Sequence, residues 1–308
     1  MRAVGEAPSK AIITGEHFVV HGAWALAAAL PRKVKVEVEP APAFRVVSER
    51  IPGKSPELRP LGRVVEEMAR EFSVSPKLKV SVTSEVPAGA GLGSSASTMV
   101  ALAASVSRLY SLGLGVDEII RFSMVGEGDI HGRPSGIDPT VCAHGGAVLF
   151  RPGSKVKVVP LDSPRTLIIS NSGVNRSTKT QIAQVSKAKD RYPGFFSMLA
   201  DSMSELSLEA AERLRDGDMR GLGRLLTADH AALGSMGVSN GTLDGMVDLF
   251  ASLGGYGAKL TGAGGGGSVV AVAPKAKEKS IVSGLTARGF ETFSAKIPVE
   301  GVKSWLGP

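Results

Sequence analysis

The residues best suited to chemistry in this chain are one lysine, two acids and a run of glycines. Lys10 lies in the apolar segment PSKAIIT, Glu127 and Asp138 flank a turn that contains proline and glycine, and GAGLGSSAS occupies residues 89–97. Near a polyphosphate, two carboxylates can divide the work, because one can bind Mg²⁺ while the other orients or deprotonates an attacking hydroxyl. Acids beside a turn are also common as solvated loop residues, so the pair alone leaves both interpretations open.

The glycine run predicts an anion-binding loop. It precedes a segment with helical spacing, and the N-terminus of a helix presents unpaired backbone N–H groups and a partial positive charge. Glycines let the backbone approach phosphate oxygens closely, and the serine hydroxyls can cap the helix or reach a metal ion bound to the phosphates. A turn with a serine cap is the alternative for this stretch alone. The predicted loop consists of Gly89, Ala90, Gly91, Leu92, Gly93, Ser94 and Ser95.

Spacing excludes several better-known sites. The Walker A pattern requires a lysine after its last glycine, and GSSAS contains no lysine. The dinucleotide-binding fingerprint requires a βαβ unit. The Ser-Ser pair and the irregular order of elements argue against that fingerprint. The segment HFVVH lacks the glutamate that follows the first histidine of the zinc-protease motif, so zinc is not expected.

Lys10 lies in a predicted strand that is followed by the pair Glu16 and His17. A partly buried lysine requires a carboxylate partner, and Asp138 is our candidate for it. A side chain that reaches solvent from an edge strand is the alternative. The second glycine run, at 262–267, stands between apolar, strand-like segments, so we expect it to approach the active site closely and not to act as a linker.

Composition and charge restrict the class of protein. The chain has 308 residues, 43% of them hydrophobic, which is enough for a large core and favours two domains. The net charge of +7 is scattered and aromatic residues make up 5%, so small anions are expected as partners and nucleic acid is not. Cys142 is the single cysteine, so no internal disulfide can form and a cytoplasmic location is expected. The apolar run at 23–30 lacks a basic lead-in, so we expect neither a signal peptide nor a membrane interaction.

Hydrophobic periodicity predicts both strands and helices. Alternation at 33–39 predicts a half-exposed antiparallel strand with 44–49 as its partner. Strands and helices follow one another without a strict βαβ repeat, which favours an α+β fold. A change of composition near 160–165 divides the chain into domains at 1–162 and 163–308. The other expected helices are at 61–72, after the glycine loop, from 117, across 178–253 and near 275–288. The other expected strands are at 78–86, 155–161, 165–170, within 255–274 and at 290–297.

Four stretches in order resemble the GHMP kinase superfamily, and within it the mevalonate kinases most closely. They are PSKAIITGEHFVVHG, PAGAGLGSSAS, IHGRPSGID and KLTGAGGGG, and together they span residues 8 to 267. The resemblance implies an N-terminal domain of the ribosomal-S5 type, a ferredoxin-like C-terminal domain and an active site between them. It also implies ATP-dependent phosphorylation of the 5-hydroxyl of mevalonate, which yields an isoprenoid precursor.

The resemblance implies a role for each chemically suited residue. Asp138 would be the catalytic aspartate that accepts the proton of the attacking hydroxyl, and Lys10 would pair with it and stabilise the developing alkoxide. Glu127 would bind Mg²⁺ together with a serine of the phosphate loop, and we favour Ser95 over Ser94. A phosphate loop of this family differs from Walker A, in agreement with the missing lysine.

The substrate contacts implied by the resemblance lie in three segments. Glu16 and His17 would line the mevalonate pocket, and Gly264 and Gly265 would approach it from the second glycine run. The segment NSGVNRSTK resembles the one that supplies a threonine beside the aspartate and a basic contact, although Asn175 replaces the proline common there. The two residues so assigned are Thr178, beside Asp138, and Arg176, whose forked guanidinium suits the mevalonate carboxylate.

Other activities compete with this assignment. A related kinase could act on phosphomevalonate or homoserine, and a catalytically silent nucleotide-binding module would belong to a different class. A silent binder would have no need for the complete set Lys10, Glu127 and Asp138. The sequence leaves the oligomeric state open, a homodimer included.

Overall fold

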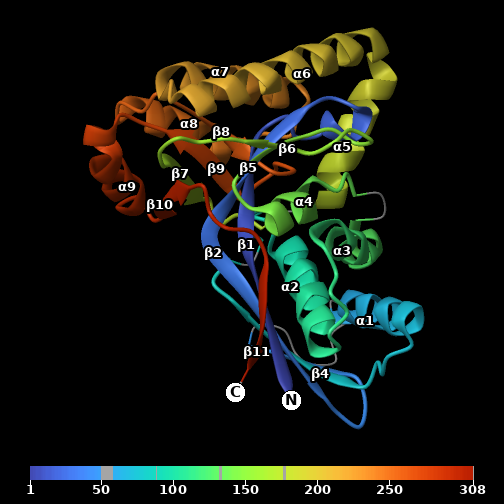
Figure 1. Ribbon diagram of the computed structural model, residues 1–308. Coiled ribbons are helices and arrows are strands. Elements are labelled where there is room, and N and C mark those ends of the chain that lie inside the picture. The colour runs from blue at the N-terminus through green and yellow to red at the C-terminus, as the bar shows by residue number, and fades with distance from the viewer. Residues whose placement is uncertain (50–57, 88, 132–133, 176–177, 308) are drawn as a thin grey trace.

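Two β-sheets form the frame of the molecule, and they lie one above the other in the view of Figure 1. The computed structural model describes residues 1–49, 58–87, 89–131, 134–175 and 178–307. The two chain ends lie side by side at the bottom of Figure 1, because the last strand pairs with the first and places Gly307 opposite Arg2. The expected α+β fold with two sheet-based parts is confirmed.

The first sheet has the strand order β11-β1-β2-β4-β3, and β5 and β6 extend it from the first half of β2. In the second half of β2, Val34, Val36 and Val38 are buried while the residues between them are partly exposed, as alternation at 33–39 predicts. The strands of this sheet are β1 Arg2–Thr14, β2 Ala25–Pro40, β3 Arg45–Ser48, β4 Leu78–Ser84, β5 Ala147–Phe150, β6 Lys157–Val159 and β11 Lys303–Gly307.

One detail of this sheet differs from the expectation, and another explains a feature of the sequence. The pairing of 44–49 with 33–39 is wrong, since β4 lies between the two segments and β3 runs parallel to β4. The apolar run at 23–30 forms the buried first half of β2, which pairs with β1 on one side and β5 on the other. A strand buried on both faces requires continuous apolar residues, which explains why this run resembles the core of a signal peptide.

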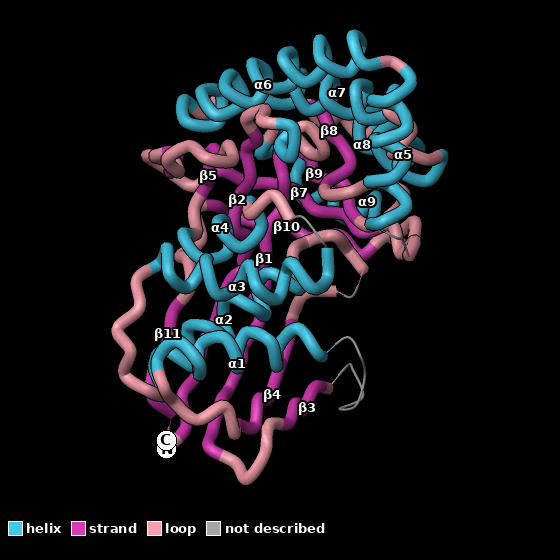
Figure 2. The backbone as a smooth tube through the Cα atoms, turned by 90° about the vertical axis from the view of Figure 1, so that its right-hand side faces the viewer, coloured by secondary structure: helices cyan, strands magenta, loops and turns pink. Residues whose placement is uncertain are grey.

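Helices cover one face of the first sheet, as Figure 2 shows. The innermost of them, α2, packs closely on β1, because a Cβ added at Gly5 would lie 2.0 Å from the carbonyl oxygen of Ala101. This close approach brings the N-terminus of α2 beside the middle of β1. The helices of this layer are α1 Arg59–Phe72, α2 Ser94–Leu109, α3 Val116–His131 and α4 Ile137–His144.

The second sheet is antiparallel and has the strand order β10-β7-β9-β8. This order, with helices inserted after its first and third strands in the chain, is the ferredoxin-like arrangement. Its strands are β7 Arg165–Asn171, β8 Gly257–Thr261, β9 Ser268–Val272 and β10 Glu291–Ile297. Its helices are α5 Thr178–Arg191, α6 Pro193–Asp216, α7 Met219–Ser235, α8 Gly241–Ser252 and α9 Glu278–Thr286.

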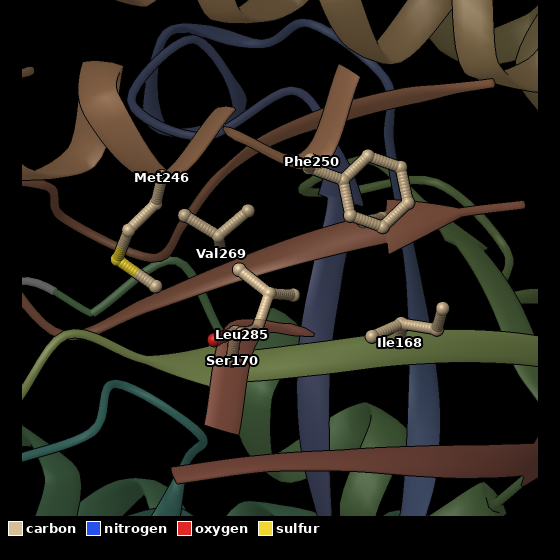
Figure 3. A pocket seen from close by; sticks show the side chains of 7 residues that line it. Ile168, Ser170, Met246, Phe250, Val269 and Leu285 are labelled. Atoms are coloured by element: carbon tan, nitrogen blue, oxygen red, sulfur yellow. The ribbon is translucent and has the colours of Figure 1, made fainter. Parts of the chain in front are cut away.

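A small pocket lies between α8, α9 and the second sheet. Figure 3 shows that the side chains of Met246, Phe250 and Leu285 point into it from the helices. Its one polar residue, Ser170, has its hydroxyl 2.8 Å from that of Thr292. The pocket is therefore part of the apolar core of the second half. The remaining lining residues are Ile168, Val269 and Ala271.

The proposed domain boundary at residue 162 falls in the connection between β6 of the first sheet and β7 of the second. The strand β11 returns to the first sheet after the second is complete, so residues 303–307 pack with the N-terminal part. The division into 1–162 and 163–308 otherwise stays our proposal. Among the described residues, no helix is both long and apolar enough to cross a membrane.

Candidate active site

The ammonium of Lys10 and the carboxylate of Asp138 form an ion pair, with Nζ 2.9 Å from Oδ1. The lysine side chain is 3% exposed, whereas that of the aspartate is 30% exposed. Lys10 therefore does not reach solvent from an edge strand, and β1 lies between β2 and β11. A buried ammonium with a partly open carboxylate partner leaves one face of the carboxylate free to meet another molecule.

Local structure explains how the two side chains meet. The backbone N–H of Lys10 donates to the carbonyl of Leu92 at 3.0 Å, which joins β1 directly to the glycine loop. Asp138 lies in the first turn of α4, which begins after Gly136 in a left-handed conformation. A carboxylate at this end of a helix is favoured by the helix dipole.

The glycine loop leads into α2 as the sequence predicts. Gly89, Gly91 and Gly93 all have positive φ, at 70°, 75° and 74°, which L-residues with side chains seldom adopt. Gly93 is the N-cap of α2 and makes no side-chain cap, so Ser94 and Ser95 are the first helical residues. The hydroxyls of Ser94 and Ser95 are therefore not used to cap the helix. Successive backbone N–H groups in such a turn form a concave site for anions.

The hydroxyl of Ser95 instead donates to Oε1 of Glu127. Glu127 is 2% exposed, and this burial raises its pKa to about 7, with the neighbouring charge of Asp138 acting in the same direction and that of Lys10 opposing it. The pair therefore lies close to the Lys10–Asp138 ion pair.

Ser95 and Glu127 fit a site for Mg²⁺ that phosphate oxygens complete. Magnesium takes oxygen ligands and is usually held by one or two protein side chains together with the phosphates of its substrate. A hydroxyl and a carboxylate already in contact at the end of the anion-binding loop supply ligands of this type. Among the described residues, no group of three or more histidine, cysteine, aspartate or glutamate side chains is arranged to hold a metal ion.

The predicted substrate residues Glu16 and His17 follow β1 directly. Glu16 is 2% exposed, and its Oε1 lies 2.5 Å from Nζ of Lys259. His17 is partly buried, and its Nε2 lies 2.9 Å from the carbonyl oxygen of Ala263 in the second glycine run. The structure thus places this turn against the C-terminal half.

The remaining predicted substrate residues are placed less directly. Gly264 and Gly265 have positive φ. A Cβ added at Gly264 would lie 2.1 Å from the carbonyl oxygen of Val238, and one added at Gly265 would lie 2.2 Å from Nε2 of Gln181. Packing within the C-terminal half therefore already requires both glycines, and their contact with substrate stays a prediction. Thr178 begins α5, and its position beside Asp138 stays a prediction. Arg176 lies outside the described residues.

Three residues that the sequence did not single out join the two halves at this site. Lys259 and Asp229 are fully buried beside Glu16, with Lys259 Nζ 3.5 Å from Asp229 Oδ2. The Ser268 hydroxyl donates to the carbonyl of Ala90 in the glycine loop at 2.8 Å. For Lys259 a signal exists, because it is a lysine in the apolar strand GAKLT, as Lys10 is in PSKAIIT.

Residues 237–241 match the pattern G-x-S-x-G, which is typical of hydrolase nucleophiles. In that motif the serine lies between a strand and a helix and acts with a histidine. Here the segment connects α7 with α8, and the hydroxyl of Ser239 donates to the carboxylate of Asp244. The geometry does not support a hydrolase site.

Comparison with known proteins identifies the family of this chain. The family model of the GHMP kinase N-terminal domain matches residues 60–146, and that of the GHMP kinase C-terminal region matches residues 207–291. The mevalonate kinases of Aeropyrum pernix and Thermococcus sibiricus are each 33% identical to this chain, with 98% of both chains covered in each case. The crystal structure of L. major mevalonate kinase in complex with R-mevalonate superimposes with a TM-score of 0.83, at 31% identity over 96% of both chains.

Matches of this identity over nearly the whole length show common ancestry as well as a common fold. One family model matches within each half of the chain, so the similarity is not confined to one domain. The chain therefore belongs to the GHMP kinase family and is similar over nearly its whole length to the mevalonate kinases of Aeropyrum pernix and Thermococcus sibiricus.

Proposed function

We propose that this chain transfers the γ-phosphoryl group of ATP to the 5-hydroxyl of mevalonate and so forms 5-phosphomevalonate. The observation that carries the proposal is the 2.9 Å ion pair of Lys10 and Asp138 beside the N-terminus of α2. The mevalonate kinases among its relatives, one of them crystallised with R-mevalonate, support the choice of alcohol.

In the proposed reaction, the carboxylate of Asp138 accepts the hydroxyl proton while the oxygen attacks the γ-phosphorus. The bond from phosphorus to the bridging oxygen breaks, and ADP leaves. Lys10 stabilises the negative charge that develops on the attacking oxygen. Phosphoryl transfer requires little covalent chemistry from a protein, so positioning and charge stabilisation account for most of the catalysis.

The phosphates of ATP would lie on the glycine loop, residues 89–95, where backbone N–H groups at the start of α2 face them. Glu127 and Ser95 would hold the Mg²⁺ that accompanies these phosphates. When bound, Mg²⁺ neutralises charge that builds up on the transferred group. The side chains that hold the metal are thus separate from those that handle the proton.

The alcohol would lie between the two halves of the molecule. His17 and Glu16 would form one wall of its pocket, with Gly264 and Gly265 near them. Arg176 would bind the carboxylate, for which a guanidinium provides two parallel N–H donors. Thr178 would lie beside Asp138 and complete the proposed contacts. A homodimer stays a prediction.

Replacement of Glu127 by Gln is expected to weaken Mg²⁺ binding. The amide keeps the size of the side chain but removes the charge that attracts the metal, so the Mg²⁺ concentration for half-maximal activity is expected to rise by about tenfold or more. A Mg²⁺ titration at saturating alcohol measures it. Glu118→Gln, on the exposed face of the same helix α3, serves as the control. An unchanged titration for Glu127→Gln would remove this residue from the metal site.

The substrate is tested by coupling ADP release to a spectroscopic assay with different alcohols. Mevalonate is expected to give the highest kcat/KM among mevalonate, phosphomevalonate and homoserine. A higher value for either of the others would assign the chain to another kinase of the family. Nucleotide binding without turnover on any of the three alcohols would favour a silent nucleotide-binding module.

A further inference from the structure

Three buried charged residues connect the two halves of the molecule and make no ion pair with Lys10 or Asp138 among the described contacts. Glu16 follows β1, Asp229 lies on α7 and Lys259 lies on β8, and none is more than 2% exposed. Nζ of Lys259 is 2.5 Å from Glu16 Oε1, 2.7 Å from the carbonyl oxygen of Leu260 and 3.5 Å from Asp229 Oδ2. Each of the three ammonium protons therefore has an oxygen to face.

Stability alone does not explain this cluster. Two carboxylates share one ammonium, and burial raises the pKa of Glu16 to about 7 and that of Asp229 above its ordinary value. Oε2 of Glu16 and Oδ1 of Asp229 have no hydrogen-bond partner among the described residues. Buried ion pairs are often no more stabilising than apolar residues of similar volume. A cluster with an excess acid is thus better explained by what it holds in place.

The cluster holds the turn that carries His17. The N–H of Gly15 donates to Asp229 Oδ2, and the N–H of Gly262 donates to Glu16 Oε1, both at 3.3 Å. His17 itself has φ of 63°, a left-handed conformation that residues other than glycine seldom adopt. Such strain persists only where the surroundings fix the backbone. Both residues before His17 are fixed by side chains of the C-terminal half.

We propose that Lys259 and Asp229 are positioning residues that hold the imidazole of His17 at the alcohol pocket. The inference rests on the proposed function, which places His17 in that pocket. The ammonium fixes Glu16, the aspartate fixes Gly15, and the ring of His17 then reaches the carbonyl of Ala263 at 2.9 Å. The two halves must therefore be joined correctly before the alcohol site is complete.

Lys259→Met tests the positioning role. Methionine keeps much of the volume but leaves Glu16 without its partner, so the turn loses its main attachment. We expect the KM for mevalonate to rise about tenfold or more, since small displacements of binding groups have large effects, while the KM for ATP stays within about twofold. Lys279→Met, on the exposed surface of α9, is the control and should change neither. Equal changes in both KM values, or none, would overturn the proposal.

A double-mutant cycle separates positioning from general damage. If Lys259 acts through His17, then Lys259→Met should raise the mevalonate KM little in a chain that already carries His17→Ala. The coupling between the two substitutions should then be about as large as the effect of Lys259→Met alone. Additive effects in the double variant would show that the lysine acts elsewhere and would overturn the proposal.

A measurement without substrate keeps this test independent of the proposed function. The ring NMR signals of His17, assigned by their loss in His17→Ala, should shift in Lys259→Met while those of His144 do not. Should Lys259→Met fail to fold, Asp229→Asn keeps both the shape and an acceptor for Gly15, and the same His17 shift is expected. Unchanged His17 signals in the folded variant would overturn the positioning role. If the His17 signals shift in Lys259→Met but the wild-type chain does not phosphorylate mevalonate, only the proposed function is overturned.

Discussion

Replacement of Asp138 by Asn is expected to lower kcat by about 10³-fold, the usual scale for a general base. The amide has the same shape but cannot accept the hydroxyl proton. It also leaves Lys10, whose side chain is 3% exposed, without its charged partner. ATP is expected to bind almost normally, because the Ser95 hydroxyl bonds to Glu127 and the backbone N–H groups of the glycine loop remain in place.

Steady-state ADP release measures kcat, and nucleotide titration of the same protein measures ATP binding. Asp162→Asn is the matched control, since Asp162 is exposed in the connection between the two sheets. Its kcat should equal that of the wild type. A loss of less than about tenfold in Asp138→Asn would contradict the catalytic assignment.

Local patterns are sufficient to predict the elements that form this site. The glycine loop and α2 follow from composition and helical spacing, and the Lys10–Asp138 contact follows from the need of a buried lysine for a carboxylate. Each of these inferences uses a short segment or a single charge. The need for a carboxylate does not by itself select Asp138 among the acids, and the resemblance to the GHMP kinases implies the same pairing.

Contacts between distant segments are harder to predict. Lys259 and Glu16 are 243 positions apart, and nothing near either residue identifies the other. A lysine within GAKLT predicts some acidic partner, but the chain contains 29 aspartates and glutamates. Only the folded arrangement of β1, α7 and β8 selects Glu16 and Asp229 from them.

Sheet edges show the same limit. The strand β11 has mostly exposed residues and no clear alternation, so its sequence does not predict a strand, and it forms by pairing with β1 at the other end of the chain. The parallel pairing of β3 with β4 likewise depends on β4 lying between β3 and β2. Strand order of this kind is a property of the whole sheet and is not contained in any one segment.

Gly93→Ala is expected to lower kcat about 100-fold, although the glycine carries no chemical group. A Cβ at this position would lie 2.7 Å from Cγ and 2.8 Å from Cε of Lys10. The lysine cannot move aside easily, because its side chain is buried and its ammonium is held by Asp138. Displacement of a catalytic group by about 1 Å can cost a factor of about 10² in rate.

Gly113→Ala separates this crowding from the cost of the backbone conformation. Gly113 has φ of 68°, close to the 74° of Gly93, but an added Cβ there would meet nothing within 4 Å. Both variants should lose about 1–2 kcal/mol of unfolding free energy from the left-handed conformation, as measured by chemical denaturation. Only Gly93→Ala should also lose activity, because only there does the methyl group press on Lys10. Equal kcat values in the two variants would mean that the glycine loop tolerates a side chain and that Lys10 is free to adjust.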